Sequence, residues 1–473
     1  MYYRLGDDVL FRQYQDFGVI TDNSEYGYRM LNDNRPIIGE KYISESGAVM
    51  LSMVSRTPRD LESIIDDLLK IFEGVDRDTL RADTLEFFDG LERTGYLVSG
   101  ESWEICQNNK SQVTVSESGE QPDDKVAEGS SDSIHQADFL RSIHFDIASA
   151  CNERCVHCYI PHKYKTDRID PELFYKVIRE GRDMNIIHVT LSGGEPLLHP
   201  DILAFLKKCH ELDLSVNVLS NLTLLNDSII GEMKQNPLLS VQTSIYSIDP
   251  KVHDSITKRE GSLEQTIIGV RKLLDANIPV QISCPVMKQN KDSVRDVIRW
   301  GNSLNIGVAI EPVIFASFDG SCSNVANRLD THEIAEVIET QLKEGYAQSY
   351  RLTAREKEAF SPDAPICSVC RYSFCVSVRG EIFPCAGWQA NIIGDACKDS
   401  IKDIWEKSEK IQELRSIKRS QFPKCVDCKD RGYCTVCMMV NSNENADRSV
   451  FRIQDYHCKV AALIHDRVDE YGE

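Results

Sequence analysis

Three cysteines, Cys151, Cys155 and Cys158, lie close together in the segment CNERCVHC at residues 151–158. Three thiolates can bind three irons of a four-iron cluster and leave the fourth iron without a protein ligand. An open coordination position is what chemistry at a metal requires, as in catalytic zinc sites. The alternative is a three-cysteine zinc site, completed by His157. We favour the cluster, and Tyr159, directly after the last cysteine, is expected to pack near a cofactor.

A glycine-rich turn, Gly193-Gly194-Glu195-Pro196, ends a predicted strand further along the chain. Two glycines let a backbone approach a ligand closely. Glu195 can accept hydrogen bonds from an ammonium group, and Pro196 stiffens the turn. Taken alone, this segment is only a turn that leads into a helix. Its meaning depends on where the fold places it relative to the three cysteines.

The chain has 17 cysteines, ten of them after position 366, which raises the choice between disulfides and metal. The first residues, MYYRLGDD, lack the apolar core of a signal peptide, and no stretch approaches the roughly 20 apolar residues of a membrane span. We therefore expect a cytoplasmic protein with no membrane partner, whose reduced thiols are available to metal. The formal net charge of -20 argues against a nucleic-acid partner, which needs a basic face.

Strands and helices alternate from about residue 139, and these elements must position both motifs. Six segments have the composition of buried strands, at residues 142–148, 187–191, 215–219, 241–246, 280–285 and 308–314. Amphipathic helices lie between them, and Asp170 is expected to cap one over residues 171–184. Six such repeats predict an α/β fold, a partial (β/α)6 TIM-like barrel over residues 139–330. Ligands of such sheets bind at the carboxyl ends of the strands, where both motifs fall.

The flanking regions have different compositions. Residues 1–100 predict a winged-helix-like domain of short strands, three helices and a closing strand, with one helix starting at Thr57-Pro58. This domain carries 11 Lys and Arg against 19 Asp and Glu, which weakens the DNA-binding role common in such folds. Residues 101–138 have the composition of a flexible acidic linker. Residues 331–365 are expected to form a helical bridge to a cysteine-rich region at 366–473.

Together, the two motifs resemble those of the radical S-adenosylmethionine superfamily over residues 141–315. The resemblance implies that a cluster on Cys151, Cys155 and Cys158 binds S-adenosylmethionine through its open iron. The strand end at residues 193–196 would hold the methionine part of this cofactor. Further cofactor contacts are implied at positions on later strand ends and the loop beyond them, namely Ser220, Asn221, Ser244 and Lys258.

The later cysteines resemble the SPASM extension of that superfamily, which carries two auxiliary [4Fe-4S] clusters and makes three clusters in all. The pattern implies that one auxiliary cluster is held by Cys425, Cys428, Cys434 and Cys458. The other would be held by Cys385, Cys437 and two of Cys367, Cys370 and Cys375. The gap between Cys434 and Cys437 is two residues, where the family has three. Paired structural zinc sites are the alternative, and the upstream motif favours iron.

In that context, residues 1–100 resemble the leader-peptide recognition domain of peptide-modifying enzymes. The resemblance implies a ribosomally made precursor peptide as partner, bound as a strand added to a sheet edge, with Gly27–Leu31 as the expected receiver. It also implies a maturase whose 5′-deoxyadenosyl radical installs an intramolecular crosslink, preferably a cysteine thioether. A reductase, flavodoxin or ferredoxin would donate electrons. Alternatives are a carbon–carbon crosslink, epimerisation, sulfatase-type oxidation of Cys or Ser, and a non-enzymatic iron–sulfur regulator that binds DNA.

Overall fold

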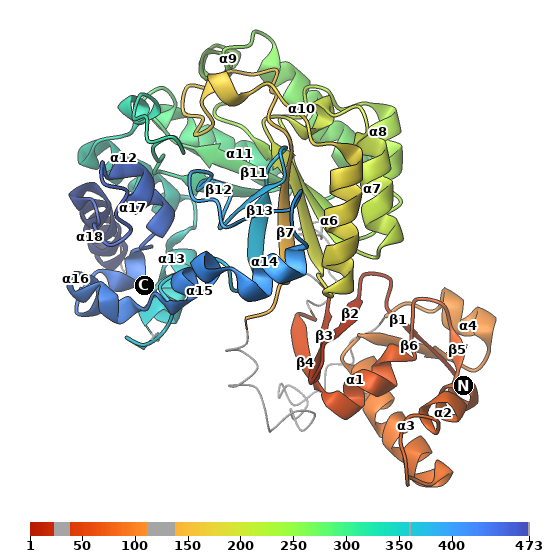
Figure 1. Cartoon of the computed structure of the whole chain (residues 1–473). Coiled ribbons are helices and arrows are strands. Elements are labelled where there is room, and N and C mark those ends of the chain that lie inside the picture. The colour runs from red at the N-terminus through yellow and green to blue at the C-terminus, as the bar shows by residue number, and fades with distance from the viewer. Residues whose placement is uncertain (23–37, 112–137, 359–360, 472–473) are drawn as a thin grey trace.

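The computed structural model describes residues 1–22, 38–111, 138–358 and 361–471. An amino-terminal domain lies against one side of a larger body, which is built on a central sheet (Figure 1). The strand expected at Gly27–Leu31 and residues 112–137 of the expected linker lie outside the described residues. No helix within the described ranges is long and apolar enough to span a membrane.

A nine-stranded sheet forms the centre of the larger body, with the strand order β12-β11-β10-β9-β8-β7-β13-β14-β15. Its first six strands along the chain are parallel to one another and correspond to the six expected strands. They are β7 (Ser142–Ala148), β8 (His188–Gly193), β9 (Ser215–Leu219), β10 (Leu239–Ser244), β11 (Val280–Pro285) and β12 (Gly307–Glu311). The partial barrel is therefore confirmed.

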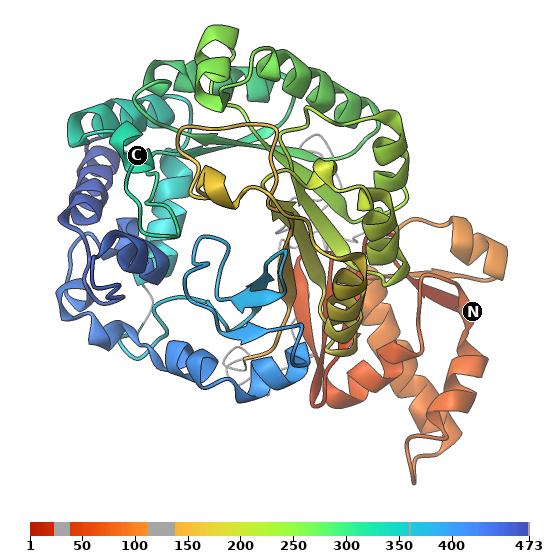
Figure 2. The ribbon, with the colours of Figure 1, turned by 45° about the horizontal axis from the view of Figure 1, so that its top comes forward.

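Helices cover the outer face of these strands (Figure 2), because one side of each strand is apolar. They are α6 (Pro171–Asp183), α7 (Ile202–Glu211), α8 (Asp227–Met233), α10 (Ser262–Asp275) and α11 (Val294–Ser303), whereas α9 (Pro250–Thr257) lies at the carboxyl ends of the strands (Figure 1). Asp170 caps α6 through the backbone N–H groups of its first turn, as expected. On β7, Phe145 is fully buried and its ring lies 4.9 Å from that of Phe174 on α6. Alternation along the strand therefore turns the even-numbered residues of β7 to the inner face of the barrel.

The cysteine-rich region continues the same sheet, which the sequence did not predict. Strand β13 (Ser373–Val376) pairs in parallel with β7, and β14 (Glu381–Phe383) and β15 (Gly394–Asp395) follow it in antiparallel pairs. Strands of two to four residues are too short to show a periodic pattern. The first part of this region is therefore a wall of the barrel.

Helices of the carboxyl-terminal half stand on the open side of the barrel (Figure 2). The expected bridge is helical, with α12 (Thr331–Lys343) and α13 (Ala347–Glu358). The helices that follow are α14 (Ile401–Lys407), α15 (Glu409–Ser416), α16 (Pro423–Val426), α17 (Met438–Glu444) and α18 (Asp455–Glu470). A partly buried ion pair between Arg328 and Glu444 ties the last barrel segment to α17. His457, at the start of α18, also reaches Glu444, at 3.4 Å.

The amino-terminal domain has two three-stranded sheets, in the orders β5-β1-β6 and β2-β3-β4. Its elements are β1 (Tyr2–Leu5), β2 (Leu10–Gln13), β3 (Phe17–Thr21), β4 (Glu40–Ser44), α1 (Glu45–Ser52), β5 (Arg59–Asp60), α2 (Leu61–Leu68), α3 (Arg77–Arg93) and β6 (Leu97–Gly100). The expected order of strands, three helices and a closing strand is present. The start of α2 differs, because Asp60 rather than Thr57 caps it. Residues 59 and 60 are extended instead, because they pair with β1.

A short helix, α4 (Trp103–Asn108), occupies the start of the segment predicted to be linker. Its Cys106 is fully buried, and the Cys106 carbonyl accepts a hydrogen bond from Arg4 Nε at 3.0 Å. The polar composition of this stretch concealed the helix, because a single buried side chain anchors it. The amino-terminal domain therefore extends to at least residue 109, where Asn109 bonds to β6.

The amino-terminal domain docks at the amino ends of the barrel strands. Arg12 on β2, only 2% exposed, donates to the Ile186 carbonyl just before β8 and pairs with Asp213 just before β9. Asn185 Nδ2 donates to the Gln13 carbonyl at 2.7 Å. An apolar cluster of Leu10, Val19, Ile187 and Leu238 lies between the two bodies. This end of the barrel is opposite to the strand ends that carry the cysteine loop.

Candidate active site

The loop with Cys151, Cys155 and Cys158 follows β7 and is held from two sides. On one side, the backbone N–H groups of Arg154 and Val156 donate to carbonyls at the end of α9, at 2.8 and 3.0 Å. On the other, Asn324 and Asn327 donate to the carbonyls of His157 and Val156, each at 3.1 Å. The three thiols are thus presented on a fixed backbone.

The two glycines at the end of β8 let the cysteine loop approach that strand. A Cβ on Gly193 would lie 2.2 Å from the Ala148 carbonyl oxygen, and one on Gly194 would lie 2.3 Å from that of Ser149. Gly193 also has φ +126°, a conformation that side chains disfavour. The close approach allows two hydrogen bonds, from Gly194 N to the Ala148 carbonyl at 2.6 Å and from Glu195 N to the Ala150 carbonyl at 2.9 Å. These glycines therefore bring the two motifs together.

Glu195 is fully buried and is bonded by the protein itself. Its carboxylate accepts from Leu197 N at 2.9 Å, Ser220 Oγ at 2.8 Å and Asn221 N at 2.8 Å. Burial raises the pKa of Glu195 to about 7, although these donors act to lower it. These hydrogen bonds join the ends of β8 and β9. An ammonium group at Glu195, as expected from the sequence, would have to compete with them. Pro196 is buried at the start of the short helix Pro196–Leu198 that follows.

Asn221 links the end of β9 to the cysteine loop. Its Nδ2 donates to Asn152 Oδ1 at 2.8 Å, and Asn152 Nδ2 donates to Thr223 Oγ1 at 2.7 Å. Thr223 Oγ1 in turn donates to Asn221 Oδ1 at 2.8 Å. The structure thus brings Ser220 and Asn221 to the loop, as expected, through contacts with the protein.

Two other expected cofactor positions lie at the inner face and the rim. Ser244 ends β10 beside Ser283 of β11. The Tyr159 ring lies 5.5 Å from that of Phe315, and burial raises the pKa of its hydroxyl well above the usual value. Both side chains stand among the strand ends around the cysteine loop.

Of the neighbours Lys258 and Arg259, it is Arg259 that contacts the cysteine loop. Lys258 is exposed and ends α9 in a left-handed conformation with φ 57°, and it bonds to no residue that the structure describes. Arg259 Nη1 donates to the Asn152 carbonyl at 3.5 Å. The adjacent His253 and Asp254 are structural: the His253 ring accepts from Tyr246 N, and Asp254 caps the start of α10.

Burial dominates the electrostatics of the loop. It raises the pKa of Cys151 to about 11 and that of Cys155 well above its usual value. Sequence reasoning missed Lys165, which faces all three thiols. Burial alone would lower the Lys165 pKa, but Cys158, Cys151 and Cys155 raise it. No spacing signal identifies this lysine, because a loop brings it back to the cysteines.

Glu153, inside the cysteine motif, is also positioned by the fold and was not predicted. It is 5% exposed, and its Oε1 has no hydrogen-bond partner in the described chain. Its Oε2 lies 3.5 Å from Cys155 Sγ, and burial raises the Glu153 pKa to about 7. A buried carboxyl oxygen without a partner indicates room for a further donor at this loop.

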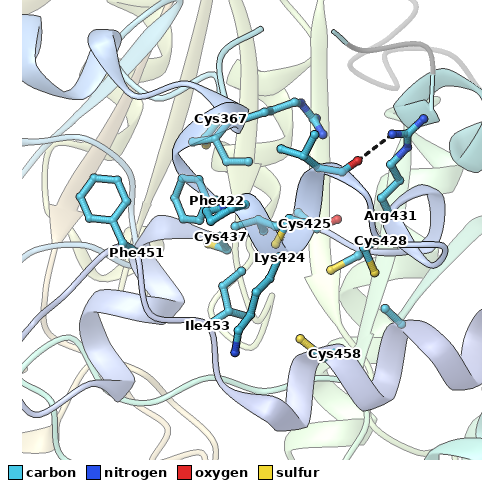
Figure 3. A pocket seen from close by; sticks show the side chains of 18 of the residues that line it. Cys367, Phe422, Lys424, Cys425, Cys428, Arg431, Cys437, Phe451, Ile453 and Cys458 are labelled. Carbon is cyan, nitrogen blue, oxygen red and sulfur yellow. Dashed lines mark hydrogen bonds between the residues drawn. The ribbon is translucent and has the colours of Figure 1, made fainter. Parts of the chain in front are cut away.

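The carboxyl-terminal cysteines gather around one cavity of about 720 Å³ (Figure 3). Six cysteines line it: Cys367, Cys425, Cys428, Cys434, Cys437 and Cys458. They include all four of one expected ligand set. Cys385 lies close to this group, since burial together with the charges of Cys437, Cys367 and Cys370 raises its pKa to about 12. Cys375 lies within β13, with its backbone in register with His144, and the charges of Cys385, Asp146 and Cys370 add to the burial that raises its pKa well above the usual value.

The cysteines are not arranged as a closed site for a single ion. Among the described residues, no three His, Cys, Asp or Glu side chains are close enough to hold one metal ion. In a zinc site, four sulfurs surround one ion at about 2.3 Å each. In a four-iron cluster each thiolate binds its own iron, so the sulfurs lie further apart. A set made only of thiolates is the donor set that a [4Fe-4S] cluster uses.

Comparisons with known proteins agree with this geometry. Residues 146–301 match the model of the Radical SAM superfamily, residues 367–429 that of the SPASM iron–sulfur cluster-binding domain, and residues 37–97 that of coenzyme PQQ synthesis protein D. The sporulation killing factor maturation protein SkfB of Bacillus subtilis is 24% identical over 56% of this chain and 65% of its own length. The antilisterial bacteriocin subtilosin biosynthesis protein AlbA of the same species is 23% identical over 64% of this chain and 68% of its own.

Two solved structures share the fold. Streptococcus suis SuiB, bound to the precursor peptide SuiA, covers 96% of this chain and 99% of its own, with a TM-score of 0.62 and 15% identity. The structure of anSMEcpe, bound to AdoMet and the Cp18Cys peptide, covers 70% of this chain and 98% of its own, with a TM-score of 0.56 and 15% identity.

Proposed function

Because this chain is a radical S-adenosylmethionine enzyme with a SPASM domain and a PqqD-type domain, we propose that it matures a ribosomally made precursor peptide. We further propose that it installs an intramolecular crosslink, preferably a thioether from a peptide cysteine. The observation that carries the proposal is the PqqD-type domain docked on the same chain as the cysteine loop. SkfB and AlbA, similar over more than half of this chain, are named for maturing or making peptides.

The chain's residues have separable tasks in this chemistry. When bound, the cluster and S-adenosylmethionine supply a 5′-deoxyadenosyl radical that abstracts a hydrogen atom. Cys151, Cys155 and Cys158 hold three irons, and the glycines at the end of β8 keep the loop against the strand. Glu153 Oε1 and Arg259 offer an acceptor and a cation at the loop.

The docking of the recognition domain sets a requirement on the substrate. The domain lies at the amino ends of the barrel strands, and the cysteine loop lies at their carboxyl ends. Strands of five to seven residues span about 20 Å at roughly 3.3 Å per residue. The modified residue must therefore be separated from the bound leader by at least about six extended residues. Tethering then raises its effective concentration at the loop.

The carboxyl-terminal cysteines would hold two auxiliary clusters. We assign Cys425, Cys428, Cys434 and Cys458 to one auxiliary cluster. For the other, we propose Cys385, Cys437 and two of Cys367, Cys370 and Cys375, because the charges of Cys367, Cys370 and Cys437 act on Cys385 and that of Cys385 acts on Cys375. A flavodoxin, a ferredoxin or another reductase would donate the electrons.

The test is co-expression, and then anaerobic reaction, with a cysteine-containing precursor peptide, to be sought as a short open reading frame beside the gene. The expected product has lost two hydrogens, and its cysteine no longer reacts with iodoacetamide. A two-hydrogen loss with an alkylatable cysteine would mean a carbon–carbon bond or, if the product carries an aldehyde that forms a hydrazone, sulfatase-type oxidation of serine. An unchanged mass in H2O with one deuterium gained in D2O would mean epimerisation, and replacement of the cysteine sulfur by an aldehyde oxygen would mean sulfatase-type oxidation of cysteine. Failure to form 5′-deoxyadenosine with the peptide present would refute the substrate.

A further inference from the structure

An aspartate–histidine pair lies on the inner face of β7, outside the cofactor contacts described above. His144 Nε2 lies 3.2 Å from Asp146 Oδ1. Gln389, four residues after Cys385, donates through Nε2 to Asp146 Oδ2 at 2.7 Å. Both oxygens of Asp146 are thus engaged, one by the imidazole and one by the carboxyl-terminal region.

Of the two side chains, that of His144 is the more accessible to a substrate. The side chain of His144 is 18% exposed, whereas that of Asp146 is 6% exposed. A neutral imidazole that donates Nε2–H to a carboxylate has its acceptor lone pair at Nδ1. No described residue bonds to His144 Nδ1. Asp146 therefore orients the imidazole and holds its Nδ1 toward the barrel interior as an acceptor, as the aspartate orients the histidine in a catalytic triad.

The location suits chemistry on a substrate in the barrel. His144 is in register with Thr190 of β8 and Cys375 of β13, so the three side chains lie on the same inner face. Asp146 is five residues before Cys151, at the strand end that leads into the cysteine loop. The pair thus lies between the cysteine loop and the carboxyl-terminal segment that contributes Gln389.

We propose that His144 is a catalytic base that takes the S–H proton from the substrate cysteine. The S–H bond breaks, an N–H bond forms at Nδ1, and the electron pair stays on sulfur as a thiolate. The step moves one proton and no unpaired electron. It rests on the proposed thioether chemistry and adds the residue that activates the sulfur.

The test uses fully reconstituted enzyme and two forms of the same precursor peptide, one with cysteine and one with selenocysteine at the modified position. His144→Gln keeps an N–H donor for Asp146 but cannot take up a proton. With the cysteine peptide, we expect crosslinking to fall about 100-fold while 5′-deoxyadenosine formation stays within about threefold. Selenocysteine should restore crosslinking to within about tenfold of wild type, since a selenol ionises without a base.

Controls separate a base from a structural latch. Thr190→Val, on the same face, should crosslink the cysteine peptide at the wild-type rate. Gln389→Ala should lose less than about tenfold, since His144 and Asp146 remain. If His144→Gln crosslinks the cysteine peptide normally, or if selenocysteine gives no rescue, His144 is not the base. If wild-type enzyme never removes two hydrogens, the proposed function fails instead.

Discussion

Replacing Gly194 by alanine tests whether the glycines serve the approach of the cysteine loop. The new Cβ would lie 2.3 Å from the Ser149 carbonyl oxygen and 2.5 Å from that of Ala150. Backbone oxygens cannot rotate away, so the loop must retreat by roughly 1.1 Å to reach an ordinary contact. Ala150 directly precedes Cys151, so the displacement acts on a cluster ligand.

The cost follows from these contacts. Overpacking contributes about 1–3 kcal/mol, and the hydrogen bonds from Gly194 N and Glu195 N to the loop are worth about 1 kcal/mol each. We expect the free energy of unfolding of the metal-free chain to fall by about 3–5 kcal/mol. Cleavage of S-adenosylmethionine by the reconstituted enzyme should fall on the order of 100-fold, because small displacements of reacting groups are costly.

The assays are urea denaturation, iron per chain after anaerobic reconstitution, and 5′-deoxyadenosine formation. Gly231→Ala on α8 is the matched control, because its Cβ would have nothing within 4 Å. That variant should be more stable by about 0.5–1 kcal/mol and should cleave S-adenosylmethionine normally. Normal iron binding and cleavage by Gly194→Ala would refute this role of the glycines.

Three further changes test other parts of the structure. Burial raises the Glu444 pKa, but His457 and Arg328 outweigh it and hold that pKa at about 2, so Arg328→Leu leaves a partly buried carboxylate with His457 as its partner and should cost about 1.5–3 kcal/mol in urea denaturation. Arg259→Ala should raise the KM for S-adenosylmethionine on the order of tenfold, because Arg259 contacts the cysteine loop, whereas Lys258→Ala should leave it unchanged. Burial raises the Glu195 pKa from 4.5 to about 7, so its contribution to stability is full below pH 4.5 and is lost as the pH rises through about 7. The Tm of wild type minus the Tm of Glu195→Gln, both measured without metal, should therefore fall between pH 5 and pH 8.

Each of these changes has an outcome that contradicts it. A loss below about 1 kcal/mol in Arg328→Leu would mean that Glu444 finds another partner or solvent. Equal KM values for Arg259→Ala and wild type would remove the arginine from the cofactor site. If the Tm of wild type minus that of Glu195→Gln rises with pH, Glu195 is ionised more easily in the folded chain than in the unfolded one.

The barrel was predictable from the sequence because its signals are local. The strands β7, β9 and β11 begin and end where their composition indicated, and Asp170 caps α6 as its position predicted. The sequence pattern did not predict elements whose conformation is set by pairing with a strand distant in the chain. Residues 59 and 60 are extended because β1 pairs with them, and β13 was missed because only its neighbour β7 defines it.

The sequence by itself determined the chemistry, because the spacing of Cys151, Cys155 and Cys158 and the glycines at 193 and 194 are properties of one short segment each. It could not decide which side chains surround that chemistry. Arg259 rather than Lys258 lies beside the loop because α9 ends in a left-handed turn. His144 and Gln389 meet at Asp146, although 245 positions separate His144 from Gln389 in the chain. Such contacts depend on strands and loops distant in sequence packing together, and only the tertiary structure records them.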